Sequence, residues 1–502
     1  MKKLLCATFE GIDAHRVSVE STLTKGLPSF NIVGMANTAI KESMERVKSA
    51  LLSNDFIFPP KRITINLSPS DLKKEGSQFD LGIALLIALD NTKVDLETWF
   101  IFGELGLDGK VKENNLLYAL ILSLVNSANL TKAMVPKESL KRLSNIPNVT
   151  FIGVDHLSEA ISILKEETEA QTVVQGEAIA YEFQEYQNVK YYFKQEYPLD
   201  FKEVKGQEIA KRAALISASG MHNLLLEGSP GCGKSMIAKR LQYILPPVDN
   251  DALLDIAKLD TLDGKEPHFS PLRPFRSPHH SSTLASVFGG GSHQARIGEI
   301  GLAHNGILFF DELPHFQKNL LEALREPLED KKIRISRVNS KVEYPTNFLF
   351  VGAMNPCPCG NLLSQQHECR CSDIEVSRYK NRLSEPFLDR IDLSIQMQSS
   401  QASDQPSFSS YELHQAVLSA HDKQRVRQQP TLNGTLDDAQ IEIYCQLSTE
   451  ALETLEMASG RFALSFRAIN KVKKVARTIA DLDNQKMIEK KHILEALSYR
   501  RR

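Results

Sequence analysis

The chain contains the stretch Gly228-Ser229-Pro230-Gly231-Cys232-Gly233-Lys234-Ser235, which matches the pattern G-x-x-x-x-G-K-[ST]. Its glycines allow backbone N–H groups to turn inward around phosphate oxygens, and a following helix directs its positive end to the same place. Lys234 is expected to reach the β- and γ-phosphates of bound ATP, and Ser235 to supply a hydroxyl group to Mg²⁺. An apolar run at 223–226 and a helical segment at 234–244 provide the strand and helix that the motif requires. The stretch therefore predicts a nucleotide-binding loop in a parallel α/β sheet.

An acidic pair, Asp311-Glu312, follows the apolar run 307–310. Because the carboxyl ends of parallel strands meet at one edge of a sheet, the pair is expected to lie beside the phosphate loop. There Asp311 would hold Mg²⁺ through water, and Glu312 would orient and polarise the attacking water. An Asp-Glu pair after a strand is usually a turn, but its place after a phosphate loop favours a catalytic role.

Three further side chains are candidates for a site of ATP hydrolysis. Asn355 follows the apolar run 348–352 and is expected to hydrogen-bond the γ-phosphate or the attacking water, although it can also be a turn residue before Pro356. Arg390 is the candidate arginine finger, because a planar, always-charged donor suits the equatorial phosphate oxygens of the transition state. If a neighbouring subunit donates Arg390, hydrolysis depends on a ring. Arg467 is expected to report the nucleotide state, and each arginine by itself can equally be a surface residue.

The 502 residues leave room for about three domains. Residues 1–165 alternate short β-branched runs with helical segments, which predicts a compact α/β domain. Residues 166–200 are polar and are expected to be a linker. Apolar strands alternating with helices over 201–400 predict a parallel-sheet ATPase domain, and 401–502 predict a helical lid domain.

The composition is that of a soluble globular protein, with 42% hydrophobic and 24% charged residues. Residues 1–6 imitate a secretory signal, but no small-residue cleavage site follows. The apolar runs 81–89 and 116–125 are too short to span a bilayer. We therefore expect a cytoplasmic protein with no membrane partner.

Four of the seven cysteines, Cys357, Cys359, Cys369 and Cys371, fall in one short segment. Four thiolates can close a tetrahedral Zn²⁺ site, which would fix a loop too small to have its own core. C-x-C pairs are less typical of zinc than C-x-x-C pairs, so free or redox-active thiols are the alternative.

The C-terminal segment 461–502 is basic, with twelve Lys or Arg against four Asp or Glu. Such a charge of about +8 suits a polyanionic partner. A solvated helix face docked on an acidic neighbour is the alternative.

The order of these motifs resembles that of the magnesium-chelatase-like AAA+ family, most closely its ComM/YifB branch. The resemblance covers nearly the whole chain. It is carried by Lys205-Gly206-Gln207, the phosphate loop, Arg276-Ser277-Pro278-His279-His280, Gly289-Gly290-Gly291, Asp311-Glu312, Arg325-Glu326-Pro327-Leu328-Glu329-Asp330, Asn355-Pro356-Cys357-Pro358-Cys359-Gly360 and Leu388-Asp389-Arg390.

This resemblance implies a hexameric ring that uses ATP and Mg²⁺ to move along single-stranded, duplex or branched DNA. The branch is similar to a helicase that promotes branch migration during homologous recombination in natural transformation, with recombination proteins as further partners. The alternative is a chelatase-type motor that remodels a protein or a tetrapyrrole-linked partner. The domain fused at 1–165 and the basic segment argue against that alternative.

The domain 1–165 resembles the proteolytic domain of Lon proteases. The stretch Lys74-Glu75-Gly76-Ser77-Gln78-Phe79-Asp80 corresponds to the Lon nucleophile motif, but Gln78 stands where the serine is expected. Ser77 is one position away, and no lysine occurs at 115–118, where the Lon base is expected. A serine without its base is inert at neutral pH, so a non-catalytic domain is expected and an active protease is the rival.

Motors of this family carry two insertions that face the channel of the ring. The resemblance places one in the Gly-rich segment 276–299, which is expected to be mobile. The other is a hairpin at 332–343, in which Arg334, Arg337 and Lys341 are candidates for contacts with DNA phosphates. An exposed charged hairpin without a nucleic-acid role is the alternative.

Overall fold

We describe the protein from a computed structural model. It describes residues 2–10, 13–114, 116–128, 130–144, 146, 148–168, 173–175, 180–266, 269–290, 296–336, 341–364, 367–398 and 405–500. The chain forms two compact units. Residues 1–180, 257–269 and 336–342 belong to the first unit, and residues 181–256, 270–335 and 343–502 belong to the second.

The first unit is built, within the described residues, on a mixed eight-stranded sheet. Its strands are β1 (Lys2–Glu10), β2 (Asp13–Thr24), β3 (Ser29–Val33), β4 (Arg62–Ser68), β5 (Phe100–Ile101), β8 (Lys132–Pro136), β9 (Thr150–Val154) and β10 (Val173–Gln175). Their order in space is β10-β9-β8-β5-β1-β2-β4-β3. β1 and β2 form an antiparallel hairpin, and β5, β8 and β9 extend the sheet in parallel from β1. The small pair β6 (Glu104–Leu105) and β7 (Val111–Lys112) is antiparallel.

Helices in the first unit supply much of its core. They are α1 (Thr38–Leu52), α2 (Asp80–Ala88), α3 (Leu117–Ser127), α4 (Leu140–Leu143) and α5 (Leu157–Leu164). α2 is apolar after its first residue and is buried along almost its whole length, as expected for a helix without a polar face. Its one acid, Asp80, is buried and pairs with Arg46 at 2.6 Å. Burial raises the pKa of Asp80, and the hydrogen bond from Arg46 opposes that shift.

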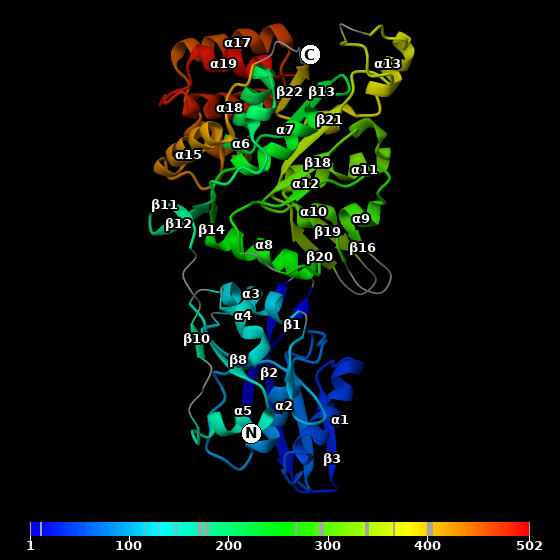
Figure 1. Cartoon of the computed structure of the whole chain (residues 1–502), viewed down its shortest axis with the longest axis vertical. Coiled ribbons are helices and arrows are strands. Elements are labelled where there is room, and N and C mark those ends of the chain that lie inside the picture. Colours follow the sequence, from blue (N-terminus) through cyan, green and yellow to red (C-terminus); the bar gives the residue numbers. More distant parts are fainter. Residues whose placement is uncertain are drawn as a thin grey trace. The chain divides into compact units, whose positions relative to one another are not determined.

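The second unit contains, among the described residues, a five-stranded sheet in which all strands are parallel. Its strands are β13 (Leu224–Gly228), β15 (Phe275–Arg276), β18 (Ile307–Phe310), β21 (Leu349–Met354) and β22 (Leu393–Met397). Their order is β15-β18-β21-β13-β22. β13, β18 and β21 are buried at every residue, because helices cover both faces of the sheet (Figure 1). This arrangement confirms the expected α/β class and the parallel-sheet domain.

Helices and small sheets surround this central sheet. The helices are α6 (Glu208–Gly220), α7 (Lys234–Leu241), α8 (Asn250–Leu262, whose ends belong to different units), α9 (Leu284–Phe288), α10 (Glu299–Leu302), α11 (Lys318–Ala323), α12 (Arg325–Asp330), α13 (Asp373–Lys380) and α14 (Glu385–Leu388). The small strands are β11 (Glu182–Tyr186), β12 (Val189–Phe193), β14 (Val248–Asp249), β16 (Gly289–Gly290), β17 (Arg296–Ile297), β19 (Lys332–Ser336) and β20 (Lys341–Pro345). The antiparallel hairpin β11–β12 pairs with β14, so residues 182–193 are a folded part of the second unit.

The C-terminal segment forms the helical lid that the sequence predicts. Its helices are α15 (Ser410–Val426), α16 (Asp438–Tyr444), α17 (Thr449–Phe462), α18 (Phe466–Leu482) and α19 (Lys490–Ser498). α15 and α18 pack on each other and on α6 of the sheet domain (Figure 1). Ser409, Ser448 and Ser465 begin three of these helices by accepting a hydrogen bond from a backbone N–H of the first turn.

Across the described part of the chain, no helix combines the length and the apolar character that a membrane crossing requires.

Candidate ATPase site

The phosphate loop joins the end of β13 to the start of α7. Gly231 and Gly233 have φ angles of 78° and 95°, in the left-handed region that favours glycine. Gly233 is the residue before α7, so the loop turns directly into the positive end of the helix. The loop therefore has the left-handed glycines and the following helix that the predicted phosphate-binding loop requires.

Lys234 and Asn355 meet inside this loop. The buried Nζ of Lys234 donates to the carbonyl oxygens of Gly228 at 2.6 Å and Ser229 at 3.0 Å. It also donates to Oδ1 of Asn355 at 3.2 Å. Asn355 follows β21, the neighbour of β13 in the sheet, and so reaches the loop from the adjacent strand. One ammonium group and one amide thus face the place where a γ-phosphate would lie.

The residues expected at the magnesium ion are also together. The hydroxyl group of Ser235 donates to Oδ2 of Asp311 at 2.8 Å, and the other carboxylate oxygen accepts the backbone N–H of Glu312 at 2.9 Å. A hydroxyl and a carboxylate at the phosphate loop are the oxygen ligands that Mg²⁺ prefers. Their geometry fits the metal that ATP brings.

Glu312 has a left-handed φ of 51° and an exposed side chain. Two imidazole rings face its Oε2 atom: Nδ1 of His280 lies 3.5 Å away and Nδ1 of His315 lies 3.8 Å away. No sequence motif assigns either histidine a role in hydrolysis. His280 follows β15 and Glu312 follows β18, and these two strands are neighbours in the sheet. A sequence-based prediction that paired the two strands could have placed His280 near Glu312.

Arg390 and Arg467 lie together, at the edge of the sheet opposite to the phosphate loop. The backbone oxygen of Arg390 accepts from the side chain of Asn223, which directly precedes β13, at 2.8 Å. Both guanidinium groups form ion pairs with Glu329 at the end of α12. The side chain of Arg390 is only 12% exposed, and burial lowers its pKa while leaving it a cation at neutral pH.

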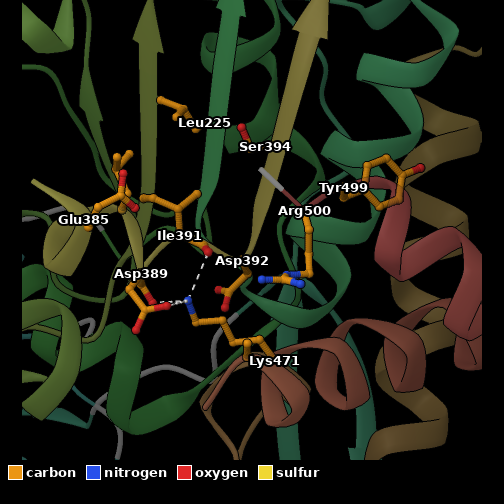
Figure 2. Close-up of a pocket in the computed structure, with 11 residues that line it drawn as sticks. Leu225, Glu385, Asp389, Ile391, Asp392, Ser394, Lys471, Tyr499 and Arg500 are labelled. Carbon is orange, nitrogen blue, oxygen red and sulfur yellow. Dashed lines mark hydrogen bonds and ion pairs between the residues drawn. The ribbon is translucent and has the colours of Figure 1, made fainter. Parts of the chain in front are cut away.

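A cavity of about 290 Å³ is lined by Asp389, Ile391 and Asp392, which flank Arg390 in the chain, and by Lys471 of α18 (Figure 2). Lys471 of α18 points toward Asp389, with Nζ 3.4 Å from Oδ1, and also donates to the backbone oxygen of Ile391 at 3.3 Å. Burial lowers the pKa of Lys471. The lid helix is therefore bonded to the loop that carries Arg390, so a lid movement would shift that arginine.

The four clustered cysteines converge on one point. Their Sγ atoms all lie within 4.8 Å of one another, and the distances from Cys357 to Cys359 and Cys369 are 3.4 and 3.7 Å. Backbone N–H groups of Asn361 and Arg370 lower the pKa of the Cys359 thiol to about 6. The cluster begins two residues after Asn355, and its last thiol directly precedes Ser372, the cap of α13.

The expected DNA contacts are located only in part. Arg334 is exposed on β19 and pairs with Glu343 of β20 at 2.6 Å. Arg337 lies outside the described residues, and for Lys341 only the backbone, in β20, is described. Gly291 of the Gly-rich motif also lies outside the described residues.

Part of the positive charge of 461–502 is used inside the lid. Arg477 is fully buried and pairs with Asp481 at 3.0 Å. Lys473 pairs with Glu442 at 2.8 Å. The net charge of residues 461–502 is therefore larger than the positive charge that is exposed for binding a partner.

In the first unit, Ser77 has no lysine partner among the residues that the structure describes. Its hydroxyl group donates to Glu104, and the side chain of Gln78 donates to the backbone oxygens of Ala7 at 3.1 Å and Glu75 at 2.8 Å. A carboxylate that accepts the serine proton in a hydrogen bond does not replace the missing lysine at this position. The non-catalytic role of this domain stays a prediction.

Comparison with known proteins gives full-length relatives. Residues 200–405 match the family model for magnesium chelatase, subunit ChlI; residues 19–139 match that for subunit ChlI of Mg-chelatase; and residues 407–500 match that for the subunit's C-terminal region. The uncharacterized protein YifB of Escherichia coli (strain K12) is 38% identical, covering 98% of this chain and 95% of the relative. Competence protein ComM of Haemophilus influenzae is 36% identical with the same coverage. Lon protease 2 of Bacillus subtilis is 24% identical over 35% of this chain and 36% of the protease.

Two substitutions test the hydrolysis site. Lys234→Ala removes the ammonium group of the loop, and Glu312→Gln keeps the shape of the side chain but removes the base. We expect both to lower ATP turnover by at least about 100-fold, with ATP binding retained in Glu312→Gln. Phosphate release and equilibrium binding of a fluorescent ATP analogue measure the two effects.

The matched control is Lys239→Ala, which removes an exposed lysine from the same helix, α7. It should hydrolyse ATP at the wild-type rate. Turnover near wild type in Lys234→Ala or Glu312→Gln would refute the assignment of this site.

Proposed function

The chain belongs to the magnesium-chelatase-like AAA+ ATPases, in their ComM/YifB branch, and on this premise we propose that it is an ATP-driven DNA translocase of the helicase type. The ring is a hexamer and uses ATP with Mg²⁺. It promotes branch migration in homologous recombination during natural transformation, together with recombination proteins. The name of the competence protein ComM supports the biological setting.

The observation that carries the proposal is the separation of Arg390 from the phosphate loop. β13 and β22 run parallel, with Leu224 opposite Leu393, so Arg390 precedes the edge where both strands begin. The phosphate loop follows the edge where β13 ends, about 13 Å further along a five-residue strand. Arg390 at one edge of the sheet and the phosphate loop at the other cannot contact the same ATP molecule. We therefore propose that Arg390 of a second copy of the chain completes the ATP pocket.

Subunits can associate head to tail, so that the Arg390 edge of one sheet faces the phosphate-loop edge of the sheet in the next subunit. Such an association forms a closed ring when the rotation from one subunit to the next adds up to a full turn. In that arrangement Arg390 and Arg467 of one subunit reach the γ-phosphate held by its neighbour. Glu329 keeps the two guanidinium groups together until the phosphate oxygens replace it. Two guanidinium groups beside the γ-phosphoryl group would stabilise the negative charge on its oxygens during transfer.

The hairpin β19–β20 and the insertion 276–299 are the proposed DNA contacts in the channel. Arg334 is exposed, and its intramolecular partner Glu343 can exchange for a DNA phosphate. Arg337 and Lys341 complete the proposed contact. Such contacts bind any sequence and weaken with salt, as a motor that moves along DNA needs.

The matches to magnesium chelatase subunit ChlI favour one alternative, a motor that remodels a protein or a tetrapyrrole-linked partner. Both functions use the same ATP pocket and the same ring. The two functions differ in what the motor acts on, which is DNA in one and a protein or a tetrapyrrole-linked partner in the other. The effect of DNA on ATP turnover therefore distinguishes them.

We further propose that Cys357, Cys359, Cys369 and Cys371 bind Zn²⁺. A tetrahedron with Zn–S bonds of about 2.3 Å has edges of about 3.8 Å. The three Sγ separations among Cys357, Cys359 and Cys369 are 3.4–3.7 Å, and Cys371 completes a group in which all Sγ atoms lie within 4.8 Å of one another. The ion would hold the loop after Asn355 against the start of α13.

The proposed function predicts that DNA stimulates hydrolysis. ATP turnover and particle mass should be measured with no DNA and with single-stranded, duplex and forked DNA. We expect a ring in the presence of ATP and DNA and a several-fold rise in turnover. A chain that binds ATP but whose turnover ignores every DNA would contradict the proposal and favour the remodelling alternative.

DNA affinity tests the hairpin. Arg334→Ala should weaken binding for all sequences alike and reduce the salt slope of log K by about one unit. Glu343→Gln frees Arg334 and should bind at least as tightly as wild type. Unchanged affinity and salt slope in Arg334→Ala would remove this residue from the interface.

The metal proposal predicts about one zinc ion per chain, measured by elemental analysis. Cys359→Ser and Cys371→Ser should lose the ion and lower the Tm, whereas Cys445→Ala, which removes a buried cysteine of the lid, should keep it. Freely reactive thiols at these positions in metal-replete, undenatured protein would contradict the zinc site.

A further inference from the structure

The loop that carries the four clustered cysteines touches the phosphate loop. Gly360, which follows Cys359, is buried and has a left-handed φ of 81°. A Cβ atom on Gly360 would lie 2.6 Å from Cδ of Pro230, the third residue of the phosphate loop. Any side chain at this position would collide with a rigid ring, so glycine is what allows the two backbones to come this close.

The cysteines set the position of Gly360. Its backbone N–H donates to the carbonyl oxygen of Cys357 at 3.0 Å, which closes a four-residue turn that contains Cys357 and Cys359. The same turn begins two residues after Asn355, whose Oδ1 accepts from Nζ of Lys234 at 3.2 Å. A movement of these two thiols is therefore transmitted to the phosphate loop at two points.

The helix α13, which follows the last of the four cysteines, is bonded to the same site. Lys380 forms an ion pair at 2.9 Å with Glu227 of β13, directly before the phosphate loop. Arg382, shortly after α13, donates at 3.1 Å to the backbone oxygen of Pro314, which lies two residues beyond Glu312. The cysteine loop is thus placed between two segments that both contact the ATPase site.

Three of the four clustered thiols are accessible to solvent. Cys359 is exposed and Cys369 and Cys371 are partly exposed, whereas Cys357 is buried. The Sγ atoms of Cys359 and Cys369 lie 3.6 Å apart, and a disulfide bond between them requires the two sulfurs to move together. The three cysteines outside the cluster, Cys6, Cys232 and Cys445, are buried. A small oxidant therefore meets the cluster first.

We propose that Cys359 and Cys369 are a peroxide-sensitive thiol pair whose oxidation weakens ATP binding through the contact of Gly360 with Pro230. The Cys359 thiolate attacks one oxygen of hydrogen peroxide, so that an S–O bond forms, the O–O bond breaks and hydroxide leaves with the electron pair. The Cys369 thiolate then attacks the sulfur of the sulfenic acid, forms the S–S bond and releases a second hydroxide. The two sulfurs lose two electrons, and the peroxide is reduced to two hydroxide ions.

The disulfide acts on the phosphate loop in two ways. It leaves two of the four thiolates, which are too few for a tetrahedral zinc site, so the loop loses the ion that would fix it. It also shifts Cys359, and with it the neighbouring Gly360 that packs on Pro230. Phosphate binding requires the backbone N–H groups of the phosphate loop to point at the phosphate oxygens, so a displaced loop binds ATP less tightly.

The release of zinc rests on the metal site proposed above, whereas the contact between Gly360 and Pro230 does not. DNA plays no part in this switch. ATP binding without DNA therefore tests the switch even if DNA fails to stimulate hydrolysis, and the zinc content of the untreated protein tests the metal site separately.

The experiment treats the full-length protein with increasing hydrogen peroxide. Peptide mass locates the disulfide, a zinc-binding dye measures released metal, and equilibrium binding of a fluorescent ATP analogue measures affinity. We expect a disulfide between Cys359 and Cys369, release of about one zinc ion per chain, and binding of the analogue weakened at least about tenfold. Cys6 and Cys445 should stay reduced, and dithiothreitol with added zinc should restore binding.

Cys232 needs its own control, because it lies in the phosphate loop and its oxidation would also weaken ATP binding. In Cys232→Ala, binding after peroxide is compared with binding by the same variant before treatment. Because the sensitive thiols are those of Cys359 and Cys369, peroxide should weaken binding by this variant as much as it does in wild type.

The contact itself is tested by Gly360→Ala without oxidant. The matched control is Gly264→Ala, because Gly264 has a similar φ of 79° but no atom within 4 Å of its Cβ position. Both variants carry the cost of a left-handed alanine, but only Gly360→Ala collides with Pro230. We expect Gly360→Ala to bind the ATP analogue at least about fivefold more weakly, and Gly264→Ala to bind it like wild type.

Unchanged ATP affinity in protein whose disulfide between Cys359 and Cys369 has formed would overturn the switch. Peroxide resistance in Cys232→Ala would also overturn it, as would oxidation of Cys6 or Cys445 before that disulfide forms. Equal affinity in Gly360→Ala and Gly264→Ala would overturn the contact, and if Gly360→Ala does not fold, the peroxide experiment on wild type still decides. Untreated protein without zinc would refute the metal site alone.

Discussion

The parallel register of β15-β18-β21-β13-β22 is the constraint on which the other features depend. A parallel sheet has two unlike edges, because every strand begins at one and ends at the other. The phosphate loop, the acidic pair after β18 and Asn355 after β21 all follow strand ends. Arg390 precedes a strand start. One register thus places the phosphate loop at one edge of the sheet and Arg390 at the other, which is why we propose that two chains share each ATP pocket.

Two structural elements converge on Glu312 from different parts of the chain. His280 arrives from the Gly-rich insertion. His315 follows Glu312 itself and meets the ring of Tyr379 on α13 edge to face, with centroids 6.1 Å apart. Burial raises the pKa of Tyr379 to about 12, so this ring stays neutral. α13 begins where the cysteine cluster ends, so the residues before α9 and the cysteine loop both border Glu312, the proposed base.

The sequence predicts the local parts of this site well, because a phosphate loop, an apolar strand and a cysteine pair each depend on neighbouring residues. The absence of a lysine at 115–118 is also visible without a fold, but the non-catalytic domain that it indicates stays a prediction. It does not predict the pairing of Glu329 with Arg390 and Arg467, or the approach of His280 to Glu312. Both contacts join segments that lie far apart in the chain. Nor does net charge reveal that Arg477 is buried against Asp481.

The central claim is that each ATP pocket is shared by two chains, and subunit mixing tests it most directly. Lys234→Ala and Arg390→Ala proteins should each be inactive alone. Mixed in equal amounts and allowed to assemble, they should recover roughly a quarter of wild-type turnover, because only pockets with an intact lysine from one chain and an intact arginine from its neighbour are complete. No recovery in mixed rings, or full activity of Arg390→Ala alone, would contradict the account.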